Sequence, residues 1–358
     1  MKLNLEDVCE RGSSSLKQSD ILGMTGDYPI YGASGYIGNV DFYHQEKPYV
    51  AIVKDGAGIG RTTFHTAKSS VIGTMQYLLP KDNVLPKYLY YVVGHMHLEK
   101  YFSGATIPHI YFKDYKSEEF NYDSLDKQKN IVEILGRCEK VISARKRELE
   151  LLDSLIKARF VEMFGDVKYG SERWGGKPFK DITINLDSKR KPVKDADRKR
   201  MQGIYPYYGA TGIVDYINDY RQDGDFLLIS EDGKALELRS KPIAFLASGK
   251  IWVNNHAHVQ QCTDECNMIY LMYHINFMDI SIWVTGIDQK KLNRANLDTI
   301  PIALPPIELQ EQFAAFVHQV DKSKLLSLIK LLEQLITYLY NVFIIYRQDK
   351  GEEVEKYE

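Results

Sequence analysis

Two stretches of the chain carry apolar residues at alternating steps of four and three, which places those residues along one side of an α-helix. The stretches cover residues 125–164 and 307–347, and Pro305 and Pro306 stand just before the second one. At ~1.5 Å per residue the first helix is roughly 58 Å long. Both stretches are long for a small domain and have charged flanks, so we expect the two helices to pack on each other. A helix lying on its own globular domain is the alternative.

The expected seam of each helix is as follows. In the first helix it comprises Ile131, Leu135, Cys138, Ile142, Leu149, Leu152 and Ile156, with Arg145 as its polar member. In the second it begins with Phe313, Val317 and Val320 and continues, after a shift of one residue, with Leu325, Leu328, Leu332, Leu335, Leu339 and Val342.

The segments outside these helices repeat one another. The motif at residues 28–35 returns at 205–212 with six of eight positions identical, and Asp55 and Gly56 correspond to Asp232 and Gly233. Further on, Tyr88 corresponds to Tyr270, Gly104 to Gly286 and Gln128 to Gln310. An ordered series of matches with one small change of length indicates a duplicated unit.

We therefore predict an α/β fold with mixed α+β character. It has two similar domains, separated by two long helices packed antiparallel, and a pseudo-twofold internal repeat. The predicted borders are residues 1–124 and 165–304 for the domains, 125–164 and 305–349 for the helices, and 350–358 for an acidic tail.

Composition adds modest constraints. The 46 basic and 48 acidic residues give a net charge of −2, which argues mildly against a protein that coats DNA without specificity but allows a local basic patch. Four cysteines are too few for a disulfide framework. The N-terminus is acidic, and the longest apolar run, at 335–346, falls short of the ~20 residues of a membrane-spanning helix. We expect a cytoplasmic protein without a membrane partner.

The duplicated pattern resembles the specificity subunits of type I restriction-modification systems over nearly the whole chain. The motifs that carry the resemblance are residues 28–33 with their copy at 205–210, 54–60, 104–110, 163–166, 254–259 and 304–310. The first half departs from the pattern at 121–124, where Leu-Pro-Pro is replaced, and the second half departs from the first at 286–289. These departures leave the helix starts and local loop roles open.

The resemblance implies a non-catalytic subunit in which each domain reads one half of a split, asymmetric double-stranded DNA target. It also implies two methyltransferase subunits and restriction subunits as partners, which would hold S-adenosylmethionine, ATP and Mg²⁺; no cofactor is expected in this chain. Phe160, Phe164, Phe343 and Ile344 are candidates for contacts with those partners, or for capping the helix pair.

The residues expected to contact DNA lie in turns and loops of both domains. The basic stretch 187–200, with seven basic and three acidic residues, favours a phosphate-contacting loop over a solvated one. The candidates in the first domain are Ser13, Ser14, Ser15, Lys17, Gln18, Tyr31, Ala33, Ser34, Lys54, Arg61 and His109. Those in the second domain are Lys189, Arg190, Lys191, Arg198, Lys199, Arg200, Tyr208, Ala210, Thr211, Asn254, Asn255, His256 and His258.

Other motifs are weaker. Residues 56–60 are rich in glycine, but the third glycine of a dinucleotide-binding fingerprint would have to stand at Arg61, so a tight turn after a strand is favoured. His256, His258, Cys262 and Cys266 have usable zinc spacings, but the first half lacks such a set and we expect no metal.

Catalytic signatures are missing from the sequence. It lacks the phosphate loop Gly-x4-Gly-Lys-Ser/Thr, the Asn/Asp-Pro-Pro-Tyr motif of adenine methyl transfer and a Gly-x-Ser-x-Gly nucleophile elbow. Two alternatives remain: a stand-alone or fused adenine DNA methyltransferase or restriction enzyme, and a coiled-coil scaffold without a DNA role.

Overall fold

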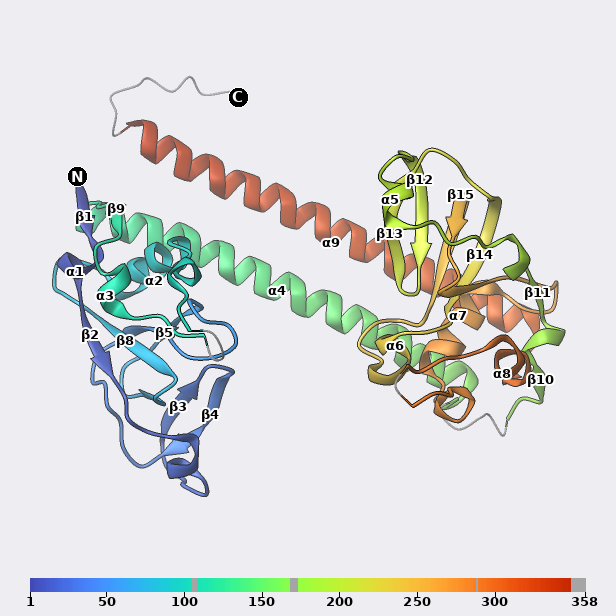
Figure 1. The fold of residues 1–358 in the computed structure, drawn as a ribbon, viewed down its shortest axis with the longest axis horizontal. Coiled ribbons are helices and arrows are strands. Elements are labelled where there is room, and N and C mark those ends of the chain that lie inside the picture. The colour runs from blue at the N-terminus through green and yellow to red at the C-terminus, as the bar shows by residue number, and fades with distance from the viewer. Residues whose placement is uncertain (105–107, 168–172, 288, 349–358) are drawn as a thin grey trace. The chain divides into compact units, whose positions relative to one another are not determined.

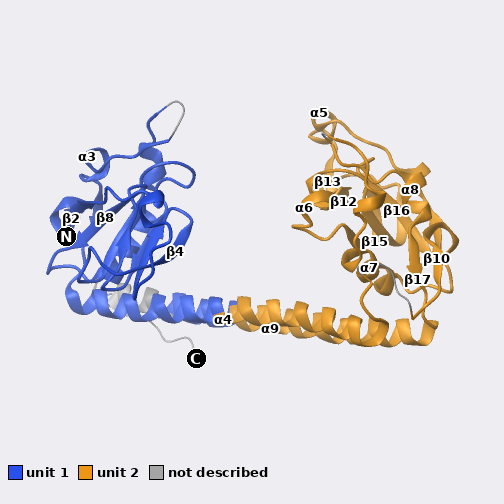
Figure 2. Ribbon diagram, turned by 90° about the horizontal axis from the view of Figure 1, so that it is seen from below, with its two compact units in different colours: residues 1–143, 332–358 blue, residues 144–331 orange. Residues whose placement is uncertain are grey.

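The computed structural model describes residues 1–104, 108–167, 173–287 and 289–348, with the main chain alone over 341–348. The chain divides into two compact units, residues 1–143 with the end of the chain from 332, and residues 144–331 (Figure 2). Each unit is described by itself below.

The first unit contains a four-stranded and a three-stranded sheet with the orders β2-β8-β5-β6 and β4-β3-β7, and β1 pairs with β9 (Figure 1). The strands are β1 (Lys2–Asn4), β2 (Cys9–Ser13), β3 (Tyr28–Gly32), β4 (Gly35–Val40), β5 (Tyr49–Val53), β6 (Thr62–His65), β7 (Ser70–Val71), β8 (Met75–Pro80) and β9 (Glu119–Asn121). The helices are α1 (Leu5–Val8), α2 (Pro86–His95) and α3 (Phe112–Tyr115), with 3₁₀ turns η1 (Gln18–Ile21) and η2 (Leu98–Tyr101).

Strand β5 is the centre of this unit, because all five of its residues are buried. Val50 and Ile52 face one apolar cluster with Leu89 of α2, and Tyr49 and Val53 face another. A continuous apolar run is the expected sequence for a strand covered on both faces. The turn that follows β5 is thereby fixed at the rim of the core.

The second unit has one six-stranded sheet of order β11-β16-β14-β15-β12-β13, and β10 pairs with β17. The strands are β10 (Gly176–Pro178), β11 (Thr183–Asn185), β12 (Gln202–Gly209), β13 (Gly212–Ile217), β14 (Gln222–Ser230), β15 (Ala244–Val253), β16 (Ala257–Cys262) and β17 (Pro301–Ala303). The helices are α5 (Asp195–Arg198), α6 (Lys234–Leu238), α7 (Met268–Phe277) and α8 (Arg294–Thr299), with 3₁₀ turns η3 (Phe179–Asp181), η4 (Asp187–Lys189) and η5 (Ser281–Trp283).

The main core of this unit lies between β14, α7 and the two long helices. Phe160 and Phe164 are fully buried there, and their rings pack against Tyr270 and Phe313. The prediction that Phe160 and Phe164 contact a partner is therefore wrong, because their apolar area is already covered by this domain. Phe343 and Ile344 have side chains outside the described part of the chain.

The two units share strand register as well as sequence, which confirms the internal repeat. In the first, β3 and β7 run parallel with Tyr31 opposite Val71; in the second, β12 and β15 run parallel with Tyr208 opposite Val253. The repeat places Tyr208 at the position of Tyr31, so the same local crossover is formed twice. Antiparallel pairs outnumber parallel pairs in protein sheets, so a parallel pair at the same place in both units is an informative match.

Two long helices complete the fold, α4 (Leu125–Phe164) and α9 (Ile307–Gln348). In the second unit they are antiparallel, since Asp153 accepts from Lys324 at 2.7 Å and Glu148 accepts from Ser327 at 2.9 Å. This confirms that the two helices pack on each other there. No helix of the described chain has the length and apolar character needed to cross a bilayer.

The predicted seam of α9 is wrong at four positions beyond Val320. The buried or half-buried positions are Lys324, Ser327, Leu331, Leu335 and Tyr338, which continue the steps of four and three without a shift. Lys324 and Ser327 are polar but find partners on α4, so the seam passes through them. The leucines predicted for the seam are exposed, except for Leu335: Leu325, Leu328, Leu332 and Leu339.

The seam of α4 needs one correction, because Ile142 is exposed and Val141 is half-buried instead. Ile131, Leu135, Cys138, Arg145, Leu149 and Leu152 are half-buried and Ile156 is buried. Val342 and the tail 350–358 lie outside the residues whose side chains are described.

Candidate nucleic-acid interface

In the first unit a histidine and an aspartate meet at the end of the buried strand. Asp55 follows β5, and its Oδ1 lies 2.6 Å from Nδ1 of His109. The backbone of His109 pairs with Ser103 in both directions, and Lys54 lies 3.8 Å from the other Asp55 oxygen. This part of the surface therefore carries an imidazole that is fixed by a carboxylate, and a half-buried lysine lies at the other oxygen of that carboxylate.

The turn that holds Asp55 depends on glycine. Gly56 and Gly60 have φ of +85° and +80°, which favours glycine. A Cβ on Gly60 would also lie 2.5 Å from the backbone nitrogen of Glu99. The turn leads into β6 and not into a helix, so a dinucleotide-binding loop is excluded here. Arg61 is exposed beside it.

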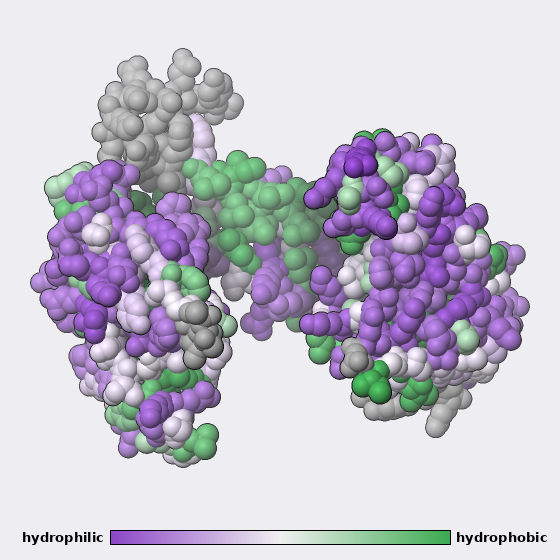
Figure 3. Space-filling view, viewed as in Figure 1, coloured by the Kyte–Doolittle hydropathy of each residue, from purple (hydrophilic) through white to green (hydrophobic). Residues whose placement is uncertain are grey.

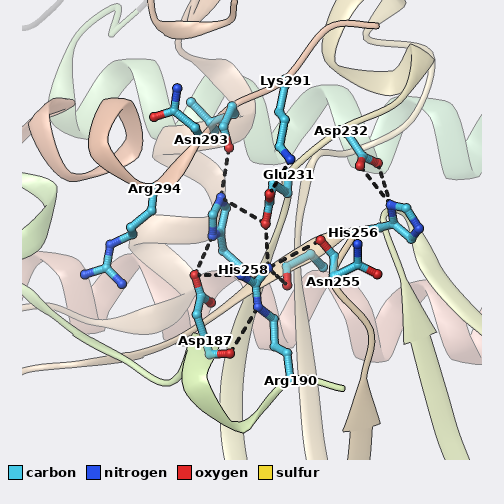
Figure 4. A network of polar contacts seen from close by, with 12 residues as sticks. Asp187, Arg190, Glu231, Asp232, Asn255, His256, His258, Lys291, Asn293 and Arg294 are labelled. Carbon is cyan, nitrogen blue, oxygen red and sulfur yellow. Dashed lines mark hydrogen bonds and ion pairs between the residues drawn. The ribbon is translucent and has the colours of Figure 1, made fainter. Parts of the chain in front are cut away.

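The second unit has a polar network at the corresponding place (Figure 4). His258 is 1% exposed, with Nδ1 2.7 Å from Asp187 and Nε2 2.8 Å from the carbonyl oxygen of Leu292. Arg190 bonds Glu231 at 2.6 Å and lies 3.3 Å from Asp187. These buried groups therefore satisfy one another within the domain.

The charges and hydrogen bonds of this network lower the pKa of two carboxyl groups. Burial alone would raise the pKa of Asp187, but the hydrogen bond and charge of His258, with Val259 N–H and Arg190, lower it overall. Burial likewise opposes ionisation of Glu231, yet hydrogen bonds from Arg190 and Lys291 lower the pKa of its carboxyl. Both groups are held as carboxylates.

His256 differs from His258 because it is open to solvent. Its Nδ1 lies 2.8 Å and 3.0 Å from the two oxygens of Asp232, and its side chain is 45% exposed. Asn255 beside it is exposed, whereas Asn254 is buried and accepts the His256 N–H. The network thus has a buried part around His258 and a surface part around His256.

The predicted basic loop also has residues that are paired inside the domain and residues that are exposed at its surface. Arg190 and Arg198 are engaged by carboxylates, Arg198 by Asp195 and Asp215. Together with the buried Tyr208, Asn254 and His258 they have roles inside the domain, so they are poor candidates for DNA contact. The candidates at the surface are Lys189, Lys191, Lys199, Arg200, Thr211 and Asn255, with Ala210 and His256 half-buried.

The candidates of the first unit lie mostly at its surface. Ser14 is buried and its hydroxyl accepts the Leu16 N–H, so it shapes the loop. Tyr31, Ala33, Lys54 and His109 are half-buried, and Ser13, Ser15, Lys17, Gln18, Ser34 and Arg61 are exposed.

The four residues considered for zinc are not brought together as ligands. Both ring nitrogens of His258 are used by Asp187 and Leu292, and His256 is turned toward Asp232. Within the described residues no group of three or more metal-binding side chains was found.

Sequence reasoning missed the acidic members of this site: Asp55, Asp187, Glu231 and Asp232. The repeat had already aligned Asp55 with Asp232, and that match could have identified both. Two exposed basic residues were also missed: Arg221, just before β14, lies over the ring of Trp252, and Lys250 on β15 lies over the ring of Tyr220. Single basic residues on strands give no distinct local pattern.

These features define a class of protein: a chain with two copies of one α/β recognition domain, joined by a long helix, each with a polar surface at the end of its buried strand. The model of the family "Type I restriction modification DNA specificity domain" matches residues 1–152 and 172–337. The chain belongs to this family, which confirms the resemblance found in its sequence.

Relatives and solved structures agree with this assignment. A putative type I restriction enzyme specificity subunit of Haemophilus influenzae is 38% identical over 144 residues, which cover 40% of this chain and 36% of the relative. The EcoprrI specificity subunit of Escherichia coli is 25% identical over 125 residues, 35% of this chain and 30% of the relative. The matched segments thus span about a third of each curated relative.

A crystal structure of a type I restriction-modification S subunit from M. genitalium has the same fold. It superposes with a TM-score of 0.61 over 96% of this chain and 94% of that one, at 15% identity. The similarity at this identity concerns the fold, and it confirms the predicted class of two mixed α/β domains with a long helix between them.

Proposed function

We propose that this chain is the DNA-recognition subunit of a type I restriction-modification complex and performs no catalysis itself. The observation that carries the proposal is the duplicated domain whose copies share a fold but differ in surface charge. In the segment before the repeated Tyr-Pro motif the second domain exposes four basic side chains, Lys189, Lys191, Lys199 and Arg200, whereas the corresponding segment of the first domain exposes Ser13, Ser15, Lys17 and Gln18. Two similar domains with different surfaces suit a target with two unlike halves.

The first domain would read one half-target and the second domain the other. The exposed lysines 189, 191 and 199 and Arg200 of the second domain suit contacts with phosphates, which position a protein on DNA. Base edges in the major groove would be read by side chains near the strand ends. The number of unread base pairs between the halves would follow from the length of α4 and α9.

The partners we propose are methyltransferase and restriction subunits, and α9 offers a surface for one of them. Its exposed apolar side chains form a stripe beside the seam, which Figure 3 shows as a gathering of apolar side chains along the helix. The stripe comprises Leu325, Leu328, Ile329, Leu332, Ile336 and Leu339, and Leu332 is 60% exposed. A contiguous apolar surface of this kind is typical of a protein interface. S-adenosylmethionine, ATP and Mg²⁺ would belong to the partners.

Selection from randomised DNA duplexes tests the proposal. The chain, co-purified with its modification subunits, is expected to enrich a motif of two short sequences with an unread gap. Mapping modified adenines in a host carrying these subunits should return the same motif. If no split motif is enriched, the chain is a scaffold without a DNA role; methyl transfer by the purified chain alone would instead indicate an enzyme.

A further inference from the structure

Each domain has a partly exposed histidine whose ring is oriented by a hydrogen bond between its Nδ1 and an aspartate. Asp55 and Asp232 occupy the same position of the repeat, directly after the buried strand, and each bonds Nδ1 of a half-exposed histidine. The distances are 2.6 Å for His109 and 2.8 Å for His256. No bond to Nε2 of either ring is found among the described residues. The ring is held on one side, and its other nitrogen remains available to a ligand.

The two histidines do not correspond to each other in the repeat. The position of His109 is taken by Lys291 in the second domain, where its Nζ lies 3.0 Å from Glu231. The position of His256 is taken by Thr74 in the first domain, where the carbonyl oxygen of Thr74 accepts from the strand end. Copying of one ancestral residue therefore does not account for the shared arrangement, because the imidazole reaches the same carboxylate from two different segments.

Stability accounts poorly for the open position of these two rings. His109 and Asp55 are 36% and 30% exposed, and ion pairs with such exposure contribute little to folding. In the second domain Asp232 is buried, but the ring of His256 that it holds is 45% exposed. His258 provides the contrast within the second domain, since it is buried and both of its nitrogens are used internally (Figure 4).

The surroundings of both rings suit a polyanion. Lys54 and Arg61 flank the Asp55 turn in the first domain. In the second, the backbone N–H of Lys191 bonds Val253, and Arg190 bonds the carbonyl oxygen of Ala257, so the exposed Lys189 and Lys191 border the turn that carries His256. The cations beside each ring would attract the phosphates of a DNA backbone. With the backbone bound there, Nε2 of the histidine would be close enough to reach a base edge in the adjoining groove.

We propose that His109 in the first domain and His256 in the second are base-reading residues, with Asp55 and Asp232 as their positioning residues. Nε2 of each ring forms a hydrogen bond with a base edge in the major groove, and the aspartate fixes the direction of that bond. This inference rests on the proposed function and adds to it which side chain reads each half-target.

The test measures base preference in each half separately. The complex is prepared with His109→Ala or His256→Ala, and each preparation selects from randomised duplexes. His109→Ala is expected to lower the preference at one base pair of one half-target about tenfold and to leave the other half unchanged. His256→Ala should affect the other half in the same manner. His97→Ala is the control, because His97 is an exposed histidine of the first domain paired with Glu99.

The role of the aspartates needs a second pair of variants. Asp55→Asn and Asp232→Asn keep the size of the side chain and remove the carboxylate. Each should weaken preference at the same base pair as its histidine partner, with an unchanged unfolding midpoint of the complex.

Two results would overturn the inference. One is an unchanged motif with His109→Ala and His256→Ala, and the other is an equal loss of affinity for all sequences, which would indicate a phosphate contact. Failure of the wild-type complex to enrich any split motif would instead refute the proposed function itself.

Discussion

Gln128 and Gln310 make the same hydrogen bonds at the starts of the two long helices. The side-chain carbonyl of each accepts one backbone N–H, from Leu85 and Asn267 respectively. Each Nε2 donates to two carbonyl oxygens, Asn83 and Asp123 for Gln128, and Glu265 and Pro305 for Gln310. Both glutamines are fully buried. The repeat thus extends to the attachment of each domain to its helix.

Replacing either glutamine is expected to destabilise its own domain. Gln310→Ala would leave the N–H of Asn267 and two carbonyl groups without partners, which should cost about 3 kcal/mol. Urea unfolding followed by hydrogen exchange measures the loss and locates it. Gln312→Ala, at an exposed position of the same helix, is the control. Equal stability of the two variants would contradict the importance of this contact.

The lysines and the arginine of the basic loop should behave differently. Lys189→Ala with Lys191→Ala is expected to weaken DNA binding by the complex without a change of stability. The slope of log affinity against log salt concentration should become shallower by about two, the value for two lost phosphate contacts. Affinity measured from 50 to 300 mM salt checks this. An unchanged slope would remove the loop from the interface.

Arg190→Ala is expected to lower stability instead. The change would leave Asp187 and Glu231 without the guanidinium that pairs with them at the rim of the network, and the loss should be about 3 kcal/mol. The unfolding midpoint of the second domain reports it. If the variant is as stable as the wild type but binds DNA more weakly, Arg190 contacts DNA and the prediction is wrong.

Asp187 gives a prediction for acid stability. Its folded pKa is lowered below the ordinary value of an aspartate, so its ionised form stabilises the fold above about pH 4. This contribution is lost as the pH falls through the folded pKa. Asp187→Asn should therefore be less stable at pH 7 and lose less on acidification to pH 2 than the wild type. Urea midpoints across this range test it, and parallel curves for the two proteins would argue against the assignment.

The exposed stripe on α9 is expected to be needed for assembly and not for folding. Leu332→Gln with Ile336→Gln should leave the unfolding midpoint within about 0.5 kcal/mol of the wild type and weaken capture of the modification subunits at least tenfold. Size-exclusion chromatography of the co-expressed subunits measures this. Leu331→Gln, at a half-buried seam position, is the comparison: it should lower stability.

Matched insertions test the spacing of the target. One heptad added to each long helix lengthens it by ~10 Å, which equals about three base pairs. The two half-targets should stay the same while the unread gap widens. An unchanged gap would mean that the helices do not set the distance.

Periodicity and the repeat predicted the two long helices and the duplication of a mixed α/β domain, whereas the site was only partly predictable. The helix limits were predictable because the steps of four and three extend to Phe164, and the repeat was predictable because buried strands need apolar runs. The seam of α9 was predicted wrongly at Lys324 and Ser327. Both are polar, and their partners on α4 are far away in the sequence, so the pattern of α9 alone does not reveal them. Arg190 and His258 looked like binding residues because their carboxylate partners come from distant segments.

The glutamine contacts have a further consequence. Gln128 and Gln310 form their hydrogen bonds with main-chain atoms. The attachment of each domain to its long helix therefore does not depend on which side chains the contacted loop carries. Mutations that alter what a domain recognises can then accumulate on its outer face without loosening it. New binding preferences could arise in one domain while the other keeps its own.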